Sequence, residues 1–564
     1  MLLTSSRISA RRTGATLFAV VVLITTMAGA VYASRAPSPN PLANAALPEV
    51  VAPVISCTAL RSMNFLLIDE APTIIRTAAV VPAAGPTPEY CRVTGYVWPQ
   101  VSFELRLPTT TWNGRYFQSG NGGFGGSIPI NSCADALDLN FAVSANDMGH
   151  TGPGALWGRD NEQLRIDYAH RATHVNAVAS KAIIDAFYGQ PASHSYFRGC
   201  STGGREGIME ATRYPNDFDG IIAGHPAAPA MQGAMGTNWL AQVASRPDAT
   251  GSGTDVYITQ PKADLLHAAV MADCDGFDGL VDGFIDDPRN CHFDPATLAC
   301  PTAVDAPDCL TAEQVTEATK LYDGARNPQG QRLYPGWIPY GSEPIWPTRP
   351  SNSASNANEQ LKYLQFKVSP PLTYTYQDFD FAHDATVGNL KYGHELYDPF
   401  DPDLSAFKAH GGKLILYHGL LDMSTTPFVS IDYYSDVLRE MGGVGQVDSF
   451  FRLFTVPGMW HCGGNPNNVR LGVGGGTPVG PDVVLQMVDW VEHGTAPEKL
   501  IASYFNDAGD TIVRTRPVFP YPTVARYDGS GSIDDASNFV AADPPVALDG
   551  DVRWIFDRAG GTKG

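Results

Sequence analysis

The chain has 564 residues, more than a single hydrophobic core needs, so we expect a large domain with an insertion or a second domain. Its 38 Lys and Arg residues against 58 Asp and Glu give a net charge of −20. This balance argues against nucleic acid or an anionic membrane as a partner.

The N-terminus has the organisation of a secretory signal. Three arginines at positions 7, 11 and 12 precede an apolar run at 15–30, and small residues follow as far as Ala33. A membrane anchor is the alternative, but the run is shorter than the ~20 residues of a span and proline-rich sequence follows it. We therefore predict a signal peptide at 1–33, a secreted or periplasmic mature chain and no membrane partner after cleavage. Sec and Tat export both stay open.

Strand-like and helix-like stretches alternate in two separate parts of the chain. The first part predicts strands at 93–107, 116–119, 141–144, 193–198 and 218–223, and helices at 165–188 and 202–214. The alternation stops at about 230 and resumes at 412, with strands at 413–418 and 449–456 and helices at 428–441 and 481–492. We predict an α/β domain formed by 50–229 and 406–564, split by an inserted lid domain at 230–405.

The sequence GCSTGG at 199–204 places Ser201 in a G-x-S-x-G frame between a predicted strand and a predicted helix. This is the arrangement of a nucleophile elbow, in which flanking glycines allow a tight turn and the serine hydroxyl projects over the sheet edge. The N-terminus of the helix would favour the oxyanion that forms when Ser201 attacks a carbonyl. The alternative is a plain glycine-rich turn.

A second glycine-rich stretch, GNGGFGG at 120–126, follows the early strand at 116–119. In an α/β-hydrolase such a loop supplies one backbone N–H of the oxyanion hole, and the residue after the nucleophile supplies the other. We therefore predict an oxyanion hole formed by Thr202 with Gly122 or Gly123. A flexible turn and a phosphate cradle are alternatives, although no Lys-Ser/Thr pair follows to make a P-loop.

Two partners for a serine nucleophile follow in the order Ser, Asp, His. Asp422 comes after the strand-like LILYHG, and His461 comes after FRLFTV. A helix N-cap acid and a loop histidine are the alternatives for these two residues. Cys200 and Cys462 directly flank Ser201 and His461, so a disulfide between them would join the nucleophile loop to the base loop; two buried thiols are the alternative.

The motifs GCSTGGR at 199–205, HGLLD at 418–422 and PGMWHCGG at 457–464 resemble the tannase and feruloyl esterase family, over about Cys57 to Phe539. The resemblance implies an α/β-hydrolase core with a lid that builds most of the substrate pocket. It also implies a catalytic triad of Ser201, Asp422 and His461 and a bridge between the two flanking cysteines. Family members cleave gallate, ferulate and related aromatic esters, and a mono(2-hydroxyethyl) terephthalate hydrolase belongs to the same family.

The nine cysteines of an exported chain are candidates for disulfides rather than metal thiolates, and no C-x-x-C pair occurs among them. The resemblance implies Cys57 with Cys91, Cys274 with Cys291 and Cys300 with Cys309. Cys133 is then left without a partner.

Acidic residues and glycines alternate in CDGFDGLVDGFIDD at 274–287. The carboxylates of Asp275, Asp278 and Asp282 suit Ca²⁺, which takes six to eight oxygen ligands, but an acidic surface turn has the same composition. The resemblance implies calcium, with the carbonyls of Leu280 and Phe284 completing the shell. Its place in the lid indicates a structural ion, and no organic cofactor is expected.

We therefore predict a small aromatic ester as the substrate, and the sequence leaves ferulate, gallate and terephthalate esters open. Arg349 could meet a carboxylate or phenolate, but surface exposure is the simpler explanation. Four lid aromatics could clamp a ring, although packing is the simpler role: Trp337, Tyr340, Trp346 and Phe366. A serine peptidase and a non-catalytic binding protein on the same scaffold are the alternative functions.

Overall fold

The computed structural model describes residues 50–227, 233–246, 255–302, 304–336, 338–464, 467–471 and 482–545. The predicted signal peptide at 1–33 and Trp337 lie outside these residues. Among the helices described, none has the length and apolar character needed to cross a membrane.

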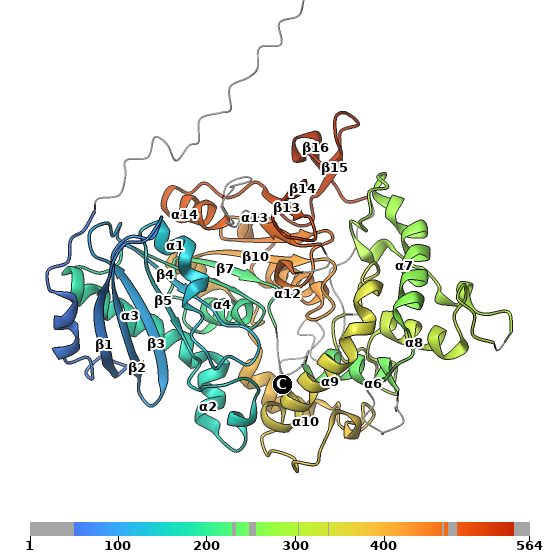
Figure 1. Cartoon of the computed structure of the whole chain (residues 1–564), viewed down its shortest axis with the longest axis horizontal. Helices are drawn as coiled ribbons and strands as arrows, with labels where there is room; N and C mark the ends of the chain where they lie inside the picture. The colour runs from blue at the N-terminus through green and yellow to red at the C-terminus, as the bar shows by residue number, and fades with distance from the viewer. Residues whose placement is uncertain are drawn as a thin grey trace, which may run out of the picture. The chain divides into compact units, whose positions relative to one another are not determined.

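A mixed sheet of nine strands is the centre of the fold, in the order β1-β2-β3-β5-β4-β6-β7-β10-β11 (Figure 1). Strand β3 is antiparallel to β2 and to β5, whereas all neighbours from β5 to β11 are parallel. The strands are Thr73–Val81 (β1), Tyr90–Val97 (β2), Val101–Pro108 (β3), Arg115–Ser119 (β4), Ala142–Asn146 (β5), His194–Cys200 (β6), Gly220–Gly224 (β7), Lys413–Gly419 (β10) and Phe451–Val456 (β11).

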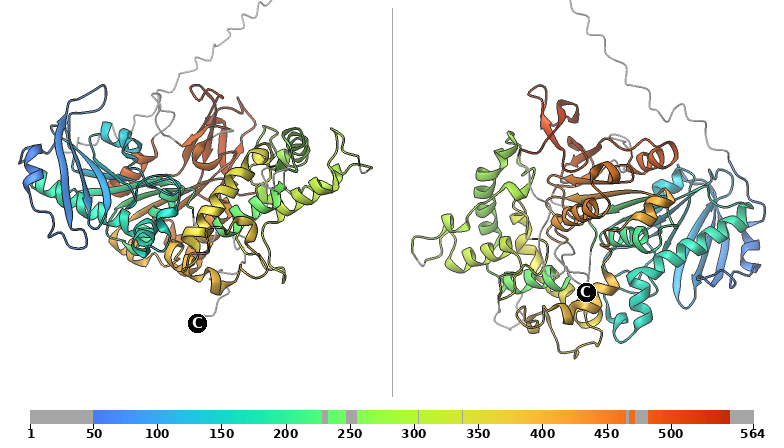
Figure 2. Two further views of the ribbon diagram at one scale, coloured as in Figure 1. Left: turned by 60° about the horizontal axis from the view of Figure 1, so that its bottom comes forward. Right: turned by 180° about the vertical axis from the view of Figure 1, so that it is seen from behind.

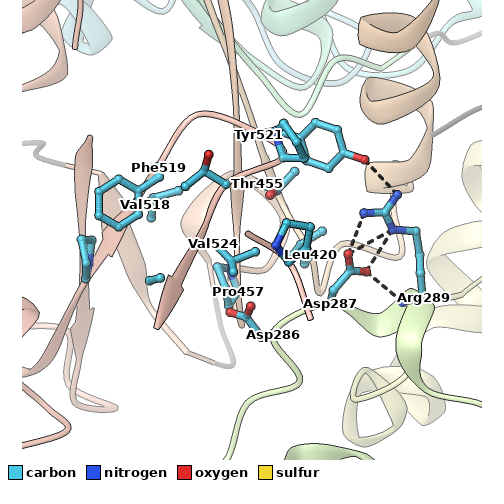
Figure 3. Close-up of a pocket in the computed structure, with 15 residues that line it drawn as sticks. Asp286, Asp287, Arg289, Leu420, Thr455, Pro457, Val518, Phe519, Tyr521 and Val524 are labelled. Carbon is cyan, nitrogen blue, oxygen red and sulfur yellow. Dashed lines mark hydrogen bonds and ion pairs between the residues drawn. The ribbon is translucent and has the colours of Figure 1, made fainter. Parts of the chain in front are cut away.

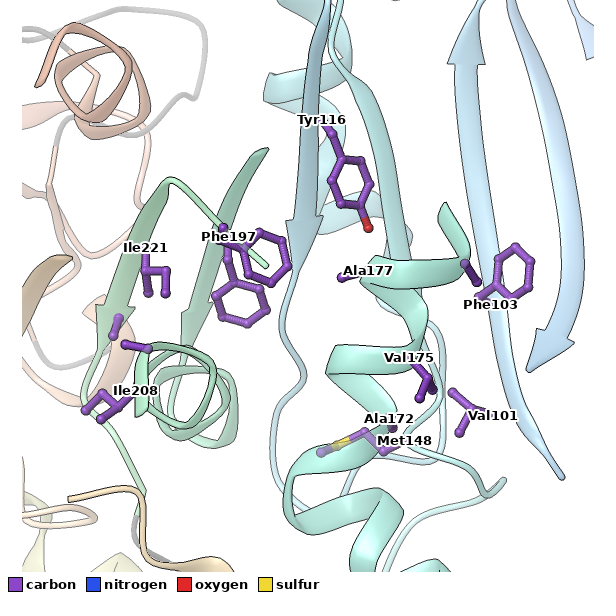
Figure 4. Close-up of a cluster of buried hydrophobic side chains, with 14 of the residues drawn as sticks. Val101, Phe103, Tyr116, Met148, Ala172, Val175, Ala177, Phe197, Ile208 and Ile221 are labelled. Carbon is purple, nitrogen blue, oxygen red and sulfur yellow. The ribbon is translucent and has the colours of Figure 1, made fainter. Parts of the chain in front are cut away.

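Helices cover both faces of this sheet because successive residues of a buried strand point to opposite sides. In β7, Ile221 belongs to a hydrophobic cluster with residues of α3, α4 and α12, whereas Ile222 packs with residues of α1 and α14. Figure 4 shows part of the first cluster. The helices of this part are Ala134–Asp138 (α1), Glu162–Ile166 (α2), Ala172–Tyr188 (α3), Thr202–Arg213 (α4), Ser405–His410 (α11), Pro427–Glu440 (α12), Val444–Val447 (α13) and Val483–His493 (α14).

Strands β7 and β10 are hydrogen-bonded neighbours, although residues 225–412 lie between them in the chain. Helices dominate this intervening segment, and Figures 1 and 2 show α7, α8 and α9 grouped together. One hydrophobic cluster of α7 and α8 also contains Met423 and Trp460, which are neighbours of Asp422 and His461. The elements are Asn238–Ala244 (α6), Ser245–Arg246 (β8), Asp255–Val256 (β9), Gln260–Cys274 (α7), Ala312–Asp323 (α8), Arg349–Gln360 (α9) and Val387–Tyr397 (α10).

Some expected elements differ from the observed ones. The single strand predicted at 93–107 is wrong: it is the antiparallel pair β2 and β3, because Pro99 in the turn between them has no N–H for a ladder. The helix predicted at 165–188 begins earlier, as α2, and one π-helical turn at Asp167–Arg171 separates α2 from α3. The sequence did not predict β1, nor the strands outside the main sheet, which are β8, β9, Val469–Leu471 (β12), Leu500–Phe505 (β13), Ile512–Val518 (β14), Val524–Tyr527 (β15) and Phe539–Ala542 (β16).

Candidate active site

Ser201 stands on a tight turn between β6 and α4. Its backbone has φ 62° and ψ −120°, and its N–H donates to the carbonyl of Gly224 at 2.9 Å. A Cβ atom at Gly199 would lie 2.4 Å from the carbonyl oxygen of Gly203, and one at Gly203 would lie 2.9 Å from that of Asn121. The turn therefore needs glycine on both sides of the serine, as the G-x-S-x-G frame predicts.

The glycine-rich loop after β4 lies against this turn. The hydroxyl of Thr202 donates to the carbonyl of Gly123 at 2.6 Å, and the N–H of Gly203 donates to the carbonyl of Asn121 at 2.7 Å. Thr202 is the first residue of α4, so its own N–H has no partner within the helix. The structure thus brings Thr202 together with the loop that holds Gly122 and Gly123, while the oxyanion-hole role stays a prediction.

Asp422 and His461 follow adjacent parallel strands, β10 and β11. The Nδ1 atom of His461 lies 2.6 Å from Oδ2 of Asp422, so Nε2 is left to face a nucleophile. The Asp422 side chain is fully buried, and that of His461 is 22% exposed. The described residues contain no hydrogen bond from Ser201 Oγ to His461, and such bonds are often long before substrate binds.

All four predicted disulfides are formed, and they join Cys57 with Cys91, Cys200 with Cys462, Cys274 with Cys291 and Cys300 with Cys309. The second of them brings the Cα atoms of its cysteines, on either side of the candidate site, to 6.0 Å. Cys133 is free and buried, as expected, and burial raises the pKa of its thiol to about 12. This thiol is therefore unreactive at neutral pH.

The carboxylate of Asp422 accepts more hydrogen bonds than a triad requires. Its Oδ2 atom receives the Thr425 hydroxyl at 2.8 Å and Nδ1 of His225 at 2.8 Å, and Nε2 of His418 lies 3.4 Å away. Burial opposes ionisation of Asp422, but attraction to His461 and the hydrogen bonds from the three histidines hold its pKa well below the usual range. The acid is therefore a stable carboxylate.

Sequence reasoning missed His225, His418 and Thr425 as partners of Asp422. His225 directly follows β7, and His418 lies in β10. A polar residue at the carboxyl end of a buried parallel strand is a signal that could have identified His225. Asp147 and His150, which also follow a strand, instead brace a loop: Asp147 accepts two backbone N–H groups, and His150 stacks on Trp157.

The acidic loop in the lid curls back on its first residue. The Asp275 carboxylate accepts the backbone N–H groups of Asp282 and Gly283 at 3.3 and 3.0 Å. Asp282 also forms an ion pair with Arg516. Carboxylates and carbonyls are the oxygen donors that Ca²⁺ prefers, so the donor set of Asp275, Asp278, Leu280, Asp282 and Phe284 fits the ion chemically. In the described residues, three side chains bring possible metal-ligand atoms within 4.8 Å of one another only at other places in the fold. The calcium site in this loop therefore stays a prediction.

The described lid aromatics lie mainly in packing positions. Tyr340 stacks on Tyr322 with ring centroids 4.1 Å apart, and Trp346 is 1% exposed and donates to Ser342. Phe366 packs against a second hydrophobic cluster, formed mainly by residues of the lid such as those of α6 and α9. Arg349 differs from these residues. Its guanidinium lies 4.5 Å from the ring centroid of Trp460, next to His461, and its Nε is buried without a hydrogen-bond partner in the described part of the chain.

Ser201 is not among the lining residues of two cavities near this region. The cavity in Figure 3 has a volume of about 40 Å³, and Arg289 beside it donates to Asp287 and to the Tyr521 hydroxyl. It is too small for an aromatic ester. The second has a volume of about 520 Å³ and is lined by Gly122 and the Cys200–Cys462 bridge, among others.

The sheet is largely parallel and is covered on both faces. It carries a serine on a turn after β6 and an Asp–His pair after β10 and β11, and this arrangement defines an α/β-hydrolase. The chain belongs to the tannase and feruloyl esterase family: the profile described as "Tannase and feruloyl esterase" matches residues 87–542. Membership of this family makes the protein a carboxylic ester hydrolase, and it confirms the predicted fold class.

Named relatives agree with this assignment. The chain is 34% identical over 573 residues to mono(2-hydroxyethyl) terephthalate hydrolase of Piscinibacter sakaiensis, a match covering 87% of this chain and 92% of that protein. It is 34% identical over 439 residues to probable feruloyl esterase B-2 of Aspergillus flavus, covering 75% of this chain and 81% of that protein. The crystal structure of feruloyl esterase B from Aspergillus oryzae matches with a TM-score of 0.76 at 28% identity, covering 86% of this chain and 100% of that one.

Proposed function

We propose that the protein is an exported serine esterase that hydrolyses esters of aromatic acids, of the feruloyl or galloyl type, through an acyl-enzyme. The observation that carries this proposal is the 2.6 Å contact between His461 Nδ1 and Asp422 Oδ2, in a loop that a disulfide ties to the loop of Ser201. This arrangement leaves Nε2 of the imidazole available to Ser201, which is the requirement of a Ser-His-Asp triad.

In the proposed reaction, Nε2 of His461 takes the proton of Ser201 as Oγ attacks the ester carbonyl carbon. The N–H of Thr202, with that of Gly122 or Gly123, stabilises the resulting oxyanion. Collapse of the tetrahedral intermediate breaks the bond to the alcohol, which leaves with the proton from His461. Water then attacks the acyl-enzyme by the same route and releases the aromatic acid. Asp422 holds the imidazole tautomer throughout.

The names of the relatives support an aromatic acyl group, and Arg349 favours a second candidate within this class. In the described part of the chain no carboxylate lies within ion-pair distance of its guanidinium, which lies on Trp460 beside the catalytic loop. A substrate with a free carboxylate or phenolate would supply the missing partner. Hydrolysis of mono(2-hydroxyethyl) terephthalate, whose acyl part carries such a carboxylate, is therefore the second candidate activity.

Export and calcium belong to the same proposal. Four disulfides are typical of proteins that fold outside the cytosol, which supports a secreted or periplasmic location. Calcium bound by Asp275, Asp278 and Asp282 with the carbonyls of Leu280 and Phe284 would supply positive charge that stabilises the lid loop. It takes no part in the proposed chemistry.

A substrate panel tests the proposal. The purified mature chain should hydrolyse at least one of methyl ferulate, chlorogenate, methyl gallate and mono(2-hydroxyethyl) terephthalate far better than a peptide of similar size. An Arg349→Met variant should raise KM for the terephthalate monoester but leave p-nitrophenyl acetate turnover unchanged. Cleavage of peptides alone would favour a serine peptidase, and no turnover of any substrate would favour a binding protein.

A further inference from the structure

Two histidines share the carboxylate oxygen of Asp422. The Nδ1 atoms of His461 and His225 lie 2.6 and 2.8 Å from the same Oδ2. His225 directly follows β7, whose last residue, Gly224, accepts the N–H of Ser201. His225 therefore contacts the carboxylate of Asp422 and is also adjacent in the chain to the residue that supports the turn of Ser201.

The environment of His225 fixes its protonation. The residue is 0% exposed, and burial lowers its pKa to about 3, although the hydrogen bond to Asp422 acts in the opposite direction. The ring is therefore neutral, and it must carry its proton on Nδ1 because it faces a carboxylate. Its Nε2 is buried without a hydrogen-bond partner in the described part of the chain. A buried polar atom left unpaired is costly, which argues against packing as the only reason for a histidine here.

Backbone strain gives a second, independent observation. Few residues other than glycine adopt a positive φ. Eight non-glycine residues of the described chain do so, and three of them are Ser201, His225 and Cys462, with φ values of 62°, 44° and 55°. His225 contacts Asp422, Cys462 directly follows His461, and Ser201 directly follows Cys200, the bridge partner of Cys462. Such strain is typical of sites where function dictates the position of a side chain.

Oδ2 of Asp422 also accepts a hydrogen bond from the uncharged hydroxyl of Thr425, at 2.8 Å. His418 contacts Ser430 through Nδ1 and the Thr425 carbonyl through Nε2, each at 2.7 Å. Besides His461, the titratable or charged groups around Asp422 and His225 are Tyr417 of β10 and Tyr334 and Arg349 of the lid. Tyr334 accepts the N–H of Thr426, and Arg349 lies on Trp460. None of them offers a short hydrogen bond that replaces the one from His225.

We propose that His225 is a positioning residue of the triad: its Nδ1–H fixes Oδ2 of Asp422 for His461 and takes up part of the carboxylate's charge. This inference rests on the proposed serine mechanism. Because His225 competes with His461 for the same oxygen, in addition to the Thr425 hydroxyl, Asp422 stabilises the imidazolium form of His461 less strongly than it would without His225.

The test compares His225→Phe, which removes the donor, with His225→Asn, whose amide N–H can occupy the place of Nδ1 and which tolerates a positive φ. With p-nitrophenyl acetate, the Phe variant should lower kcat about 3- to 10-fold with KM changed less than twofold. The acidic midpoint of its kcat/KM profile should move to higher pH by about 0.5 unit. The Asn variant should restore both. Melting temperatures establish that the variants are folded.

His174→Asn is the matched control, because His174 is also buried and contacts a carboxylate, that of Asp217, at 2.5 Å, beyond the opposite end of β7. It should leave the pH profile unchanged. A lower kcat in both His225 variants with an unmoved midpoint, or wild-type kinetics in the Phe variant, would overturn the positioning role. The rate at which a fluorophosphonate labels the protein is measured in parallel. If the wild type is not labelled and does not hydrolyse ester, the proposed mechanism and this inference are both refuted. If the wild type is active and the variants are unchanged, only the inference is refuted.

Discussion

The loops at the carboxyl ends of the strands and the inserted lid are held together in different ways. The strand-end loops are fixed by short hydrogen bonds between side chains, most of which converge on Asp422. The lid is mainly helical and supplies most residues of two hydrophobic clusters, and two of the four disulfides lie within it. The two regions meet where Trp460 and Met423 enter a lid cluster.

Under the proposed function, this difference separates the residues that carry out the chemistry from those that select the substrate. Hydrogen bonds place atoms to within a fraction of an ångström, which acid–base catalysis needs. Apolar clusters tolerate substitution when volume is kept, so the lid can change its surface while the triad stays fixed. Changes at the strand ends should therefore affect kcat, and changes in the lid should affect stability and KM.

The largest effect is expected at the nucleophile. Ser201→Ala should lower kcat at least about 10³-fold, because triad members act as a unit. The melting temperature should change little, since the side chain makes no hydrogen bond within the described residues. Ester turnover and thermal melting of the same preparation measure both quantities. Substantial turnover by this variant would contradict a serine mechanism.

The bridge between Cys200 and Cys462 should act on rate more than on folding. Replacing both cysteines by alanine frees the base loop, and a displacement of about 1 Å can cost ~10²-fold in rate, so kcat should fall about 10- to 100-fold. The sheet and the other three disulfides should keep the protein folded. A matched Cys300→Ala/Cys309→Ala variant, which opens a bridge within the lid, should leave kcat nearly unchanged. Equal losses of kcat in both double variants would contradict the distinction between the two regions.

The sequence predicted the strand-end loops better than the lid because their features depend on residues that are close together in the chain. The glycines around Ser201 are required by contacts of 2.4 to 2.9 Å, so the turn is visible in the sequence. Asp422 and His461 were found because strand ends collect polar groups. His225 follows a strand in the same way, but its role depends on a carboxylate 197 residues away. The lid has no repeating pattern, and packing of Tyr340 or Trp346 depends on long-range contacts that periodicity does not encode.

Calcium removal tests the lid without touching the strand ends. If calcium binds only the folded lid, it stabilises by about 2.7 kcal/mol at 100 times its Kd. EGTA should therefore lower the melting temperature by several degrees and change kcat less than about twofold, and added Ca²⁺ should restore the melting temperature. The Asp278→Asn variant should lose this response. A chain without calcium by metal analysis, and without a shift on adding it, would show that the loop is only an acidic turn.

The smallest effect is expected from a carboxyl group beneath the glycine-rich loop at 120–126. Glu206 is 1% exposed and accepts hydrogen bonds from the Asn121 N–H at 3.1 Å and the Thr173 hydroxyl at 2.9 Å. Burial raises the pKa of Glu206 from 4.5 to about 7, with Arg205 opposing the shift. The folded state thus binds the proton more tightly than the unfolded state does. The stability from this group is full below pH 4.5 and is lost as the pH rises through 7.

A Glu206→Gln variant keeps an acceptor for Asn121 but has no proton to lose. Relative to this variant, the wild type should lose on the order of 2 kcal/mol of unfolding free energy between pH 5 and pH 8. Melting curves or denaturant titrations of both proteins at the two pH values measure this difference. Thr173→Val removes a neighbouring donor but retains the carboxyl group, so it should keep the wild-type dependence on pH. Parallel stability curves for the wild type and the Gln variant would mean that Glu206 is ionised across this range, and that the glycine-rich loop at 120–126 rests on a permanent charge.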